Sequence, residues 1–580
     1  MEIENNDKEK IITNMITEST NGKYGLAWDR EKEPEKIVEQ CDKYIPILQP
    51  VEEKDIKLGN IDNILIEGDN FHALTDLCYT HKESVDVIYI DPPYNTGNKD
   101  FVYNDKFVDE EDGYRHSKWL NFMEKRLLLA RTLLKKDGII CISIDDNEYA
   151  QLKLLCDSIF FERNRLSTQH IQVRYADKTL NEKNDWQPVM EYVLIYARNA
   201  NEFKANKPKE DYSIGKFVYE FQELTPGTEF TVKGRKITVF KKGEWQLVKH
   251  DAPREDLLKE TWVSGSIYSG TGNGTMVQNV IEPRVETDGY GSLYKIEGLG
   301  EDGLGYRYFT GPQKKGATRS KMYSGIPVVK LEELNSGEAV KYKSIPNIFD
   351  YSPDFGNIRL EGGIAFNSGK KPVKMLKDLI NYHPNKNAVV LDFFAGSGST
   401  GHAVLELNKE DGGSRKFILC TNNESNICEE ITYPRLKNVM EGYSSKKALG
   451  ENLRYLKTEF IRNTNNRDQL KFDLTEKCIP MLCVKESTFN LVSETEEYKI
   501  YTNNDKTKYT CVYYEMFGDL YEEFLEKIKQ IEEQKTLYIF SLGDTTEQEG
   551  LEDVKNYKIE SIPHRIIEFY KRTIKLCKEN

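Results

Sequence analysis

The sequence predicts an α/β protein with a doubly wound, Rossmann-like sheet that is split by a mainly β insert and followed by a small α+β module. Short apolar runs alternate with amphipathic stretches over residues 61–200, and the same alternation returns over 341–440. Between them, residues 201–340 hold 18 of the chain's 39 glycines and short alternating segments. Alternating strands and helices are typical of parallel sheets covered on both faces.

The first half of the sheet is predicted within residues 61–200. Residues 119–138 carry apolar side chains at spacings of three and four, which indicates a helix, and Gly138 is its expected end. Residues 71–81 form a second helix-like stretch. The strands are expected in four apolar runs, NILIEGDN (63–70), VDVIYIDPPYN (85–95), GIICISIDDNE (138–148) and EYVLIYARN (191–199). Residues 1–60 are expected to form a polar N-terminal arm with a short helix near 34–42.

The remaining elements follow from the same patterns. In the insert, KITVF and WQLVK are predicted hairpin strands, and residues 263–275 are a loop by composition. The second half of the sheet is expected in a helix (371–382), a strand entering a glycine-rich turn (387–400), a helix (401–409) and a strand (415–424). Residues 441–580 are predicted to form a partner or dimer module, with a helix at 521–534 and a strand at 535–542.

Composition excludes several classes of protein. The first ten residues are charged, and no apolar stretch approaches the roughly 18 residues of a membrane span, so neither a secretory signal nor a membrane segment is expected. The ten cysteines form no Cys-x-x-Cys pair, which disfavours a disulfide scaffold or a cysteine-rich metal site and favours the cytoplasm. We expect no bound metal.

Charge is distributed unevenly along the chain. The net charge is −14, which on average disfavours binding to a phosphate backbone. Residues 201–340, however, hold 20 basic and 20 acidic residues, so the rest of the chain carries the whole excess. A neutral segment in an acidic chain permits a local basic face.

The most specific motif is Asp91-Pro92-Pro93-Tyr94 at the end of a predicted parallel strand. The carboxyl ends of such strands are where α/β sheets bind ligands. The two prolines remove N–H donors, Asp91 supplies an acceptor, and Tyr94 supplies a flat aromatic face. Two acceptors on the hydrogens of an exocyclic amine would localise its nitrogen lone pair. The motif therefore predicts a site for a planar amide or exocyclic amine, against the alternative of a strand-terminating turn.

A second motif lies about 300 residues later. Its small residues allow close approach of backbone to a ligand at the start of a helix. It lacks the P-loop lysine and the spacing of a dinucleotide fingerprint, and a simple tight turn is the alternative. Glu424, at the end of the next strand, is a candidate acceptor for ribose hydroxyls or a solvated carboxylate. The motif comprises Asp392, Phe393, Phe394, Ala395, Gly396, Ser397, Gly398 and Thr400.

The order of these motifs resembles that of β-class amino-group DNA methyltransferases, in which the DPPY motif precedes a target-recognition insert and the glycine-rich cofactor motif follows it. More narrowly, the chain is similar to the modification (Mod) subunits of type III restriction–modification systems. The similarity is carried by IEGDN (66–70), IYIDPPYNTGNKDFVYND (88–105), SIDDNE (143–148) and FNSGKKPVKML (366–376). One departure is Met190 in WQPVMEY, where the family often has histidine before Glu191 and Tyr192.

The resemblance implies an S-adenosylmethionine-dependent enzyme that methylates N6 of an adenine flipped out of duplex DNA. It implies that the DPPY residues Asp91, Pro92, Pro93 and Tyr94 are catalytic, and that the glycine-rich motif lines the cofactor pocket. Further cofactor residues are expected at Asp69, Asn70, Phe366, Lys371, Pro372 and Glu424. The expected DNA-binding residues are a basic cluster beside Tyr323 in the insert, namely Lys314, Lys315, Arg319 and Lys321.

Expected partners are duplex DNA, a second copy of the chain and a separate helicase–nuclease restriction subunit, since no P-loop or nuclease motif is visible. The expected location is the bacterial cytoplasm, at the nucleoid through DNA. Three alternatives remain open: methylation of N4 of cytosine, methylation of a protein amide or RNA base, and a catalytically silent DNA-recognition subunit.

Overall fold

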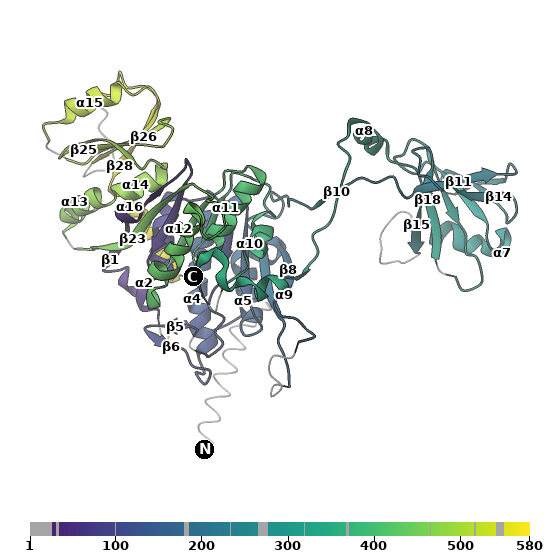
Figure 1. Cartoon of the computed structure of the whole chain (residues 1–580), viewed down its shortest axis with the longest axis horizontal. Helices are drawn as coiled ribbons and strands as arrows, with labels where there is room; N and C mark the ends of the chain where they lie inside the picture. The colour runs from purple at the N-terminus through teal and green to yellow at the C-terminus, as the bar shows by residue number, and fades with distance from the viewer. Residues whose placement is uncertain are drawn as a thin grey trace, which may run out of the picture. The chain divides into compact units, whose positions relative to one another are not determined.

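The computed structural model describes residues 26–30, 34–98, 100–178, 185–232, 234–264, 277–317, 319–366, 370–464, 466–515, 518–540 and 550–579. The chain divides into two compact units, which are described separately (Figure 1). The main unit combines the residues up to Asn206 with those from Pro346 onward, and the insert unit is Lys207–Ile345. The main unit therefore contains both chain segments in which strands and helices were predicted to alternate.

The main unit is built on an 11-stranded sheet with strand order β1-β23-β3-β22-β21-β4-β7-β9-β8-β20, and β2 pairs with β23 beside this path. The strands from β23 to β7 in this order are parallel, whereas β1 and β9 run antiparallel to their neighbours. The α/β class is confirmed, but the sheet is mixed. The strands are β1 (Tyr44–Pro50), β2 (Ile56–Lys57), β3 (Asp62–Glu67), β4 (Val85–Ile90), β7 (Leu134–Ile144), β8 (Arg165–Gln172), β9 (Met190–Ala197), β20 (Ile348–Asp350), β21 (Val389–Asp392), β22 (Lys416–Thr421) and β23 (Asn452–Arg462).

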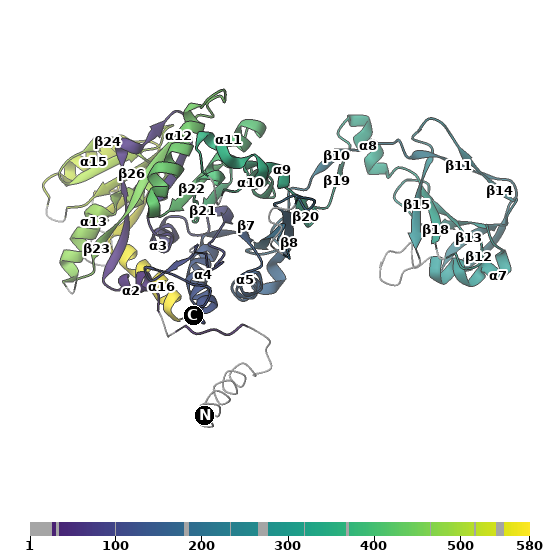
Figure 2. The same ribbon diagram turned by 60° about the horizontal axis from the view of Figure 1, so that its bottom comes forward.

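Helices cover both faces of this sheet (Figure 2). Successive residues of a strand point to opposite faces. In β4, Ile88 and Ile90 pack with α3, α4 and α5, whereas Val87 and Tyr89 pack with α10, α11 and α12. Every residue of β4 is buried, as expected for a strand covered on both sides. The helices are α2 (Lys36–Gln40), α3 (Asn70–Thr80), α4 (Arg115–Leu133), α5 (Tyr149–Cys156), α9 (Ser352–Gly356), α10 (Val373–Ile380), α11 (Ser399–Asp411) and α12 (Tyr433–Glu441).

The end of α4 differs from the prediction. The helix ends at Leu133, and β7 begins at the next residue and contains Gly138. A side chain at Gly138 would place its Cβ atom 2.9 Å from the carbonyl oxygen of Val85 on the neighbouring strand. Gly138 therefore permits close approach of two strands and does not terminate a helix.

Two strands of the sheet come from segments that we predicted outside it. Residues 44–50, expected in the N-terminal arm, form β1, and residues 452–462, expected in the C-terminal module, form β23. The two strands pair antiparallel, and β23 pairs with β3. The N-terminal and C-terminal segments thus complete one edge of the main sheet.

Within the part of the C-terminal segment that the structure describes, a five-stranded sheet and four helices are added to the main unit. Helix α16 packs on α3 and α4, and its Tyr570 hydroxyl donates to the backbone carbonyl of Pro46 at 2.7 Å and to the Asp76 carboxylate. The elements are α13 (Arg467–Lys477), α14 (Ile479–Glu486), β24 (Asn490–Glu494), β25 (Tyr498–Thr502), β26 (Lys508–Tyr513), α15 (Tyr521–Lys529), β27 (Gln534–Phe540), β28 (Tyr557–Ile562) and α16 (His564–Glu579).

The carboxyl group of Asp76 makes stability depend on pH. Burial raises its pKa from 3.8 to about 8, although the Tyr570 hydroxyl opposes the shift. Because the folded state holds the proton more tightly, stability is expected to fall as pH rises from about 4 to about 8, by about 1.4 kcal/mol per unit, and to level off above. Asp76→Asn should therefore unfold at a higher urea concentration than the wild type at pH 9, and the difference should vanish towards pH 4. An equal difference at both pH values would contradict this assignment.

The insert unit contains an eight-stranded antiparallel sheet with strand order β12-β13-β16-β17-β18-β15-β11-β14. The unit is mainly β, as predicted, and the predicted strands KITVF and WQLVK correspond to β13 and β14. Most of the loop predicted at 263–275 lies outside the described residues. The elements are β10 (Lys209–Asp211), β11 (Phe217–Glu223), β12 (Thr228–Val232), β13 (Arg235–Phe240), β14 (Trp245–Lys249), β15 (Leu258–Ser264), α7 (Val285–Asp288), β16 (Leu293–Glu297), β17 (Tyr306–Thr310), β18 (Arg319–Ser324), α8 (Val328–Ser336) and β19 (Val340–Tyr342), which pairs with β10.

Candidate active site

The two predicted motifs lie at the same edge of the main sheet. Strand β4 ends at Ile90, directly before Asp91, and β21 ends at Asp392. The two strands are parallel neighbours, with Leu391 opposite Ile88. Residues about 300 positions apart in the chain therefore begin their loops side by side at the carboxyl ends of adjacent strands, where α/β sheets bind ligands.

A cluster of four polar side chains surrounds the first motif. The ammonium nitrogen of Lys371 lies 3.0 Å from Oδ1 of Asp91 and 3.3 Å from Oε2 of Glu191. It also donates a hydrogen bond to the Tyr94 hydroxyl at 2.9 Å, and that hydroxyl donates to Oε2 of Glu191 at 2.9 Å. Lys371, which the resemblance assigns to the cofactor, thus contacts the residues assigned to catalysis.

Burial and charge act in opposite directions within this cluster. Burial raises the pKa of Asp91, and the nearby Lys371 ammonium only partly offsets the rise. For Lys371, burial alone would lower the pKa, but the charges of Asp91 and Glu191 outweigh it and raise the pKa above its usual value. The lysine, whose side chain is 9% exposed, is therefore held as a cation between two carboxylates.

Neighbouring residues fix the backbone of the first motif. The indole N–H of Trp119, on α4, donates to the carbonyl of Pro93 at 2.8 Å. The amide of Asn95 donates to Glu148 at 2.5 Å while its backbone adopts a φ of 57°. Among the described residues, none donates a hydrogen bond to the carbonyl of Pro92. The loop therefore keeps a backbone acceptor beside the Asp91 carboxylate.

The glycine-rich turn is organised by Asp392. One carboxylate oxygen accepts from the backbone N–H of Phe394 at 2.9 Å, and the other accepts from the Thr400 hydroxyl at 2.6 Å. Burial raises the pKa of Asp392 to about 7. Gly396 and Gly398 have φ angles of 47° and 75°, in the region that glycine adopts most readily. The turn thus depends on glycine at both positions before α11 begins.

The loop after β3 is tied to the glycine-rich turn. The Asp69 carboxylate caps α3 by accepting from the N–H of Phe71 at 2.7 Å. The amide of Asn70 donates to the carbonyl of Phe393 at 3.1 Å, and its oxygen accepts from Arg126 at 2.5 Å. Asp69 and Asn70 therefore lie beside the predicted cofactor motif.

The other predicted cofactor residues have varied surroundings. The Ser397 hydroxyl accepts from the buried Arg435 at 3.2 Å, and Ala395 is buried within the core. Phe366 is partly buried and precedes residues 367–369, which are not described. Pro372 is the N-cap residue of α10. Glu424 is exposed in the short helix after β22, and its predicted contact with ribose stays a prediction.

Several side chains of the site were not assigned roles from the sequence, among them Glu191, Arg126 and Arg435. Glu191 matches the family pattern, but its position beside Tyr94 depends on β9 starting at the edge where β7 ends. Arg126 and Arg435 are fully buried cations whose partners come from distant segments: Arg126 pairs with Glu35 at 2.9 Å and Arg435 with Glu361 at 3.0 Å. No sequence pattern indicated either pair.

In the insert unit, one residue of the predicted basic cluster, Lys321, lies beside an aromatic residue other than the one expected. Tyr323 is buried, and its hydroxyl donates to Glu260. The exposed ring is that of Trp262, which is 61% exposed and lies 4.8 Å from the ammonium of Lys321. Lys314 and Lys315 are exposed in the loop before β18, and Arg319 begins that strand.

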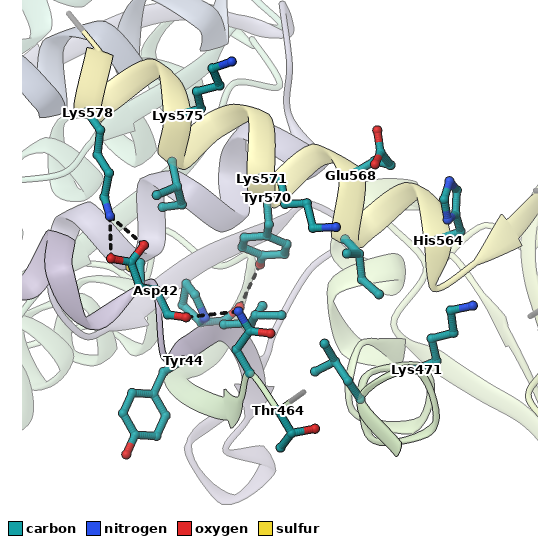
Figure 3. A pocket seen from close by; sticks show the side chains of 17 residues that line it. Asp42, Tyr44, Thr464, Lys471, His564, Glu568, Tyr570, Lys571, Lys575 and Lys578 are labelled. Carbon is teal, nitrogen blue, oxygen red and sulfur yellow. Dashed lines mark hydrogen bonds and ion pairs between the residues drawn. The ribbon is translucent and has the colours of Figure 1, made fainter. Parts of the chain in front are cut away.

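A cavity of about 890 Å³ lies elsewhere in the main unit, between β1, α13 and α16 (Figure 3). Its walls include Asp42, Lys571 and Tyr570, and none of its lining residues belongs to the predicted catalytic or cofactor sets. The described residues contain no cluster of histidine, cysteine and acidic side chains suited to a metal ion. They also include no helix that is long and apolar enough to cross a bilayer.

Comparison with known proteins identifies several relatives of this chain. The chain is 32% identical over 420 residues to the Mod subunit of the type III restriction–modification enzyme StyLTI of Salmonella typhimurium, covering 66% of this chain and 57% of that protein. It is 32% identical over 403 residues to the EcoPI Mod subunit of Escherichia phage P1, covering 63% and 58%. It is 29% identical over 384 residues to the type II methyltransferase M.KpnI of Klebsiella pneumoniae, covering 65% and 84%.

The chain spans less than three fifths of the length of these two type III relatives. The DNA methylase family of N6 and N4 enzymes matches residues 85–433, a segment that includes Asp91, Glu191, Lys371 and the glycine-rich turn. That match extends over more than half of the chain and spans the insert and the strands on either side of it. The chain therefore belongs to the N6/N4 DNA methylase family.

Proposed function

We propose that the protein transfers a methyl group from S-adenosylmethionine to N6 of a flipped adenine in duplex DNA, as the modification and recognition subunit of a type III-like restriction–modification system. The observation that carries the proposal is the adjacency of β4 and β21, which brings Asp91 and the glycine-rich turn to one edge of the sheet. Family membership and the printed names of the relatives support it.

The first motif suits an exocyclic amine. Lys371 is paired with Oδ1 of Asp91, which leaves Oδ2 to accept one hydrogen of the amine, and the carbonyl of Pro92 accepts the other. An adenine within a duplex cannot reach these groups, so it must be extruded at a cost of a few kcal/mol. Stacking on Tyr94, worth roughly 1–3 kcal/mol, offsets part of that cost.

The second motif fits S-adenosylmethionine. A Cβ atom built on Gly396 would meet nothing nearer than the Phe394 carbonyl at 3.8 Å, so the absent side chain leaves open space over the turn. When bound, the cofactor supplies an electrophilic methyl group on a sulfonium. We assign its binding to Asp69, Asn70, Phe366, Pro372, Asp392, Phe393, Phe394, Ala395, Gly396, Ser397, Gly398, Thr400 and Glu424, with Lys371 at the boundary with the target site.

The protein's main contribution to the reaction is positioning. Asp91 and Pro92 would hold the amine with its nitrogen facing the cofactor pocket, because transfer of the methyl group requires the two reactants to be oriented toward each other. On transfer, the nitrogen would gain the methyl group as the carbon–sulfur bond breaks with its electron pair left on sulfur, and the nitrogen would then lose one of its two hydrogens as a proton to water. Asp91 orients the amine through its acceptor oxygen and does not need to act as a strong base.

The proposed function also suggests a role for each of the remaining parts of the chain. Residues 201–340 would recognise the DNA sequence through the major groove, with Lys314, Lys315, Arg319 and Lys321 as DNA contacts. Residues 61–200 and 341–440 would form the catalytic and cofactor halves. The arm 1–60 and the module 441–580 would contact a second copy of the chain and a helicase–nuclease restriction subunit in the bacterial cytoplasm, near the nucleoid.

The proposed function is tested by labelled methyl transfer to unmethylated genomic DNA, followed by digestion to nucleosides. We expect the label in N6-methyladenine, and sequencing of DNA from strains with and without the gene should give the recognition sequence. Label in N4-methylcytosine would overturn the assignment to adenine. An absence of transfer to DNA by the folded protein would favour a non-catalytic recognition subunit.

The exposed Trp262 gives a separate test of the insert. If the surface formed by Trp262 and Lys321 binds DNA, Trp262→Ala should weaken binding to a duplex that carries the recognition sequence by about tenfold. The reason is that an aromatic contact to a base or sugar is lost. Leu224→Ala, at another exposed apolar residue of the same unit, should leave the affinity unchanged. Fluorescence anisotropy measures both, and equal affinities for Trp262→Ala and the wild type would remove this surface from the DNA interface.

A further inference from the structure

Trp186 is the most exposed large apolar side chain among the described residues, at 89%. Tryptophan is highly buried on average in folded proteins, because its ring system carries a large apolar surface. It lies in the loop between β8 and β9, which also exposes Tyr175 at 37%. The loop therefore presents two aromatic side chains, and aromatic side chains are the groups on which proteins stack nucleic-acid bases.

The residues that follow Trp186 are held in place by hydrogen bonds to the first part of the loop. The backbone N–H of Val173 donates to the carbonyl of Val189 at 2.9 Å, which closes the base of the loop. The guanidinium of Arg174 donates to the carbonyl of Pro188 at 2.9 Å, and the side-chain amide of Gln187 donates to the carbonyl of Lys178 at 2.9 Å. Trp186 is thus presented to solvent next to an anchored backbone.

The strand register places this loop at the edge of the sheet that carries Asp91. Strand β7 is parallel to β4, and β9 is antiparallel to β7 with Tyr192 opposite Ile144, the last residue of β7. The loop therefore enters β9 at the carboxyl end of β7. Glu191, five residues after Trp186, already contacts Tyr94 and Lys371. Five residues of extended chain span about 17 Å at most, which limits the separation of Trp186 from the site.

Charge does not explain what this surface binds. Among the described loop residues, the cations Arg174 and Lys178 are matched by Asp177 and Asp185. The ammonium of Lys178 lies 4.0 Å from the centre of the Tyr175 ring. The loop therefore offers aromatic faces and no excess of positive charge, which favours stacking on a base over contact with phosphates.

On this basis we propose that Trp186 stacks within the duplex in the space that the everted adenine leaves, and so holds the target base in the Asp91 site. The proposal rests on the proposed function, since it requires an extruded base. Proteins that distort DNA commonly insert apolar side chains between base steps. Trp186 is then a positioning residue that acts on the helix from which the adenine has left.

The test compares two duplexes, both carrying the recognition sequence obtained from methylated genomic DNA. One is fully paired, and in the other the target adenine faces an abasic site, which lowers the cost of extrusion. Trp186→Ala should reduce the single-turnover rate on the paired duplex by about 10–100-fold, and should come within about threefold of the wild type on the abasic duplex. Trp186→Phe should retain most of the rate on both. With 2-aminopurine at the target position, Trp186→Ala should lower the fluorescence increase caused by extrusion.

Two control variants separate this role from others. Asp91→Ala should be inactive on both duplexes, because the abasic site lowers the cost of extrusion but does not supply the missing carboxylate. Trp262→Ala should show the same loss of affinity on both. The proposal is wrong if Trp186→Ala is equally impaired on both duplexes, and it is also wrong if this variant is unimpaired on both. An unimpaired variant would assign the surface to a protein partner. If the wild type methylates neither duplex, the proposed function itself has failed.

Discussion

Asp91→Ala is expected to lower methyl transfer to DNA by at least about 10³-fold while leaving the affinity for S-adenosylmethionine within about twofold. The carboxylate supplies an acceptor aimed at the reacting amine, and removal of one such polar group commonly costs 10²–10³-fold in rate. The additional loss is expected because Lys371 loses one of the two carboxylates that it contacts. Single-turnover methylation and calorimetric titration of the cofactor measure the two quantities.

The Asp91 experiment needs a control for folding. Asp91→Asn preserves the size of the side chain and removes its charge, so it should also bind S-adenosylmethionine normally and transfer methyl groups slowly. A parallel loss of cofactor binding and transfer in both variants would indicate that Asp91 supports the fold. Binding retained by both variants would place its effect in the chemical step or in capture of the adenine.

Lys371→Met is expected to reduce the rate at pH 7 by about 100-fold and to make it depend strongly on pH. Burial already raises the pKa of Asp91, and the lysine ammonium opposes that rise. Without the ammonium, the pKa of Asp91 should rise further, so its acceptor carboxylate would be lost to protonation at a higher pH than in the wild type. The methylation rate of Lys371→Met should therefore increase from pH 6 to pH 9, and by a larger factor than the rate of the wild type does.

Lys371→Arg is the matched control, since it keeps the positive charge between Asp91 and Glu191. It should retain a pH profile close to that of the wild type even if its rate is lower, because guanidinium and ammonium groups differ in geometry. A Lys371→Met variant with an unchanged pH profile and weaker binding of S-adenosylmethionine would return Lys371 to the cofactor site, as the family resemblance implies.

Sequence patterns predicted the centre of the fold because that region obeys local rules. The runs around Ile64, Ile88 and Leu391 are strands, and family order indicated that the DPPY motif and the glycine-rich turn would share an edge. The direction of β9 was not predicted, because periodicity does not indicate whether a strand runs parallel or antiparallel to its neighbour. The strands β1 and β23 were not placed in the sheet, because pairing over hundreds of residues leaves no periodic signal. The end of α4 was misplaced since Gly138 marks a close approach between strands and only resembles a helix stop.

The polar cluster of the site was predicted only in part for the same reason. Asp91 and Tyr94 belong to one short motif, so their proximity follows from the chain itself. Glu191 and Lys371 reach them from strands and loops 97 and 277 residues away from Tyr94. A charged residue that is paired across such a distance has the same local sequence signature as one in solvent, so only the fold identifies its partners.

The pairing of β21 with β4 has a consequence for how the polypeptide matures on the ribosome. At about 5–20 residues per second, the roughly 300 residues between Asp91 and Asp392 take about 15–60 s to synthesise. During that interval one edge of β4 has no neighbouring strand, so its backbone hydrogen-bonding groups on that edge are unpaired. All six side chains of β4 are apolar or neutral except that of Asp86. The newly made N-terminal half is therefore exposed to aggregation until the glycine-rich turn emerges, and chaperone demand should be greatest in that window.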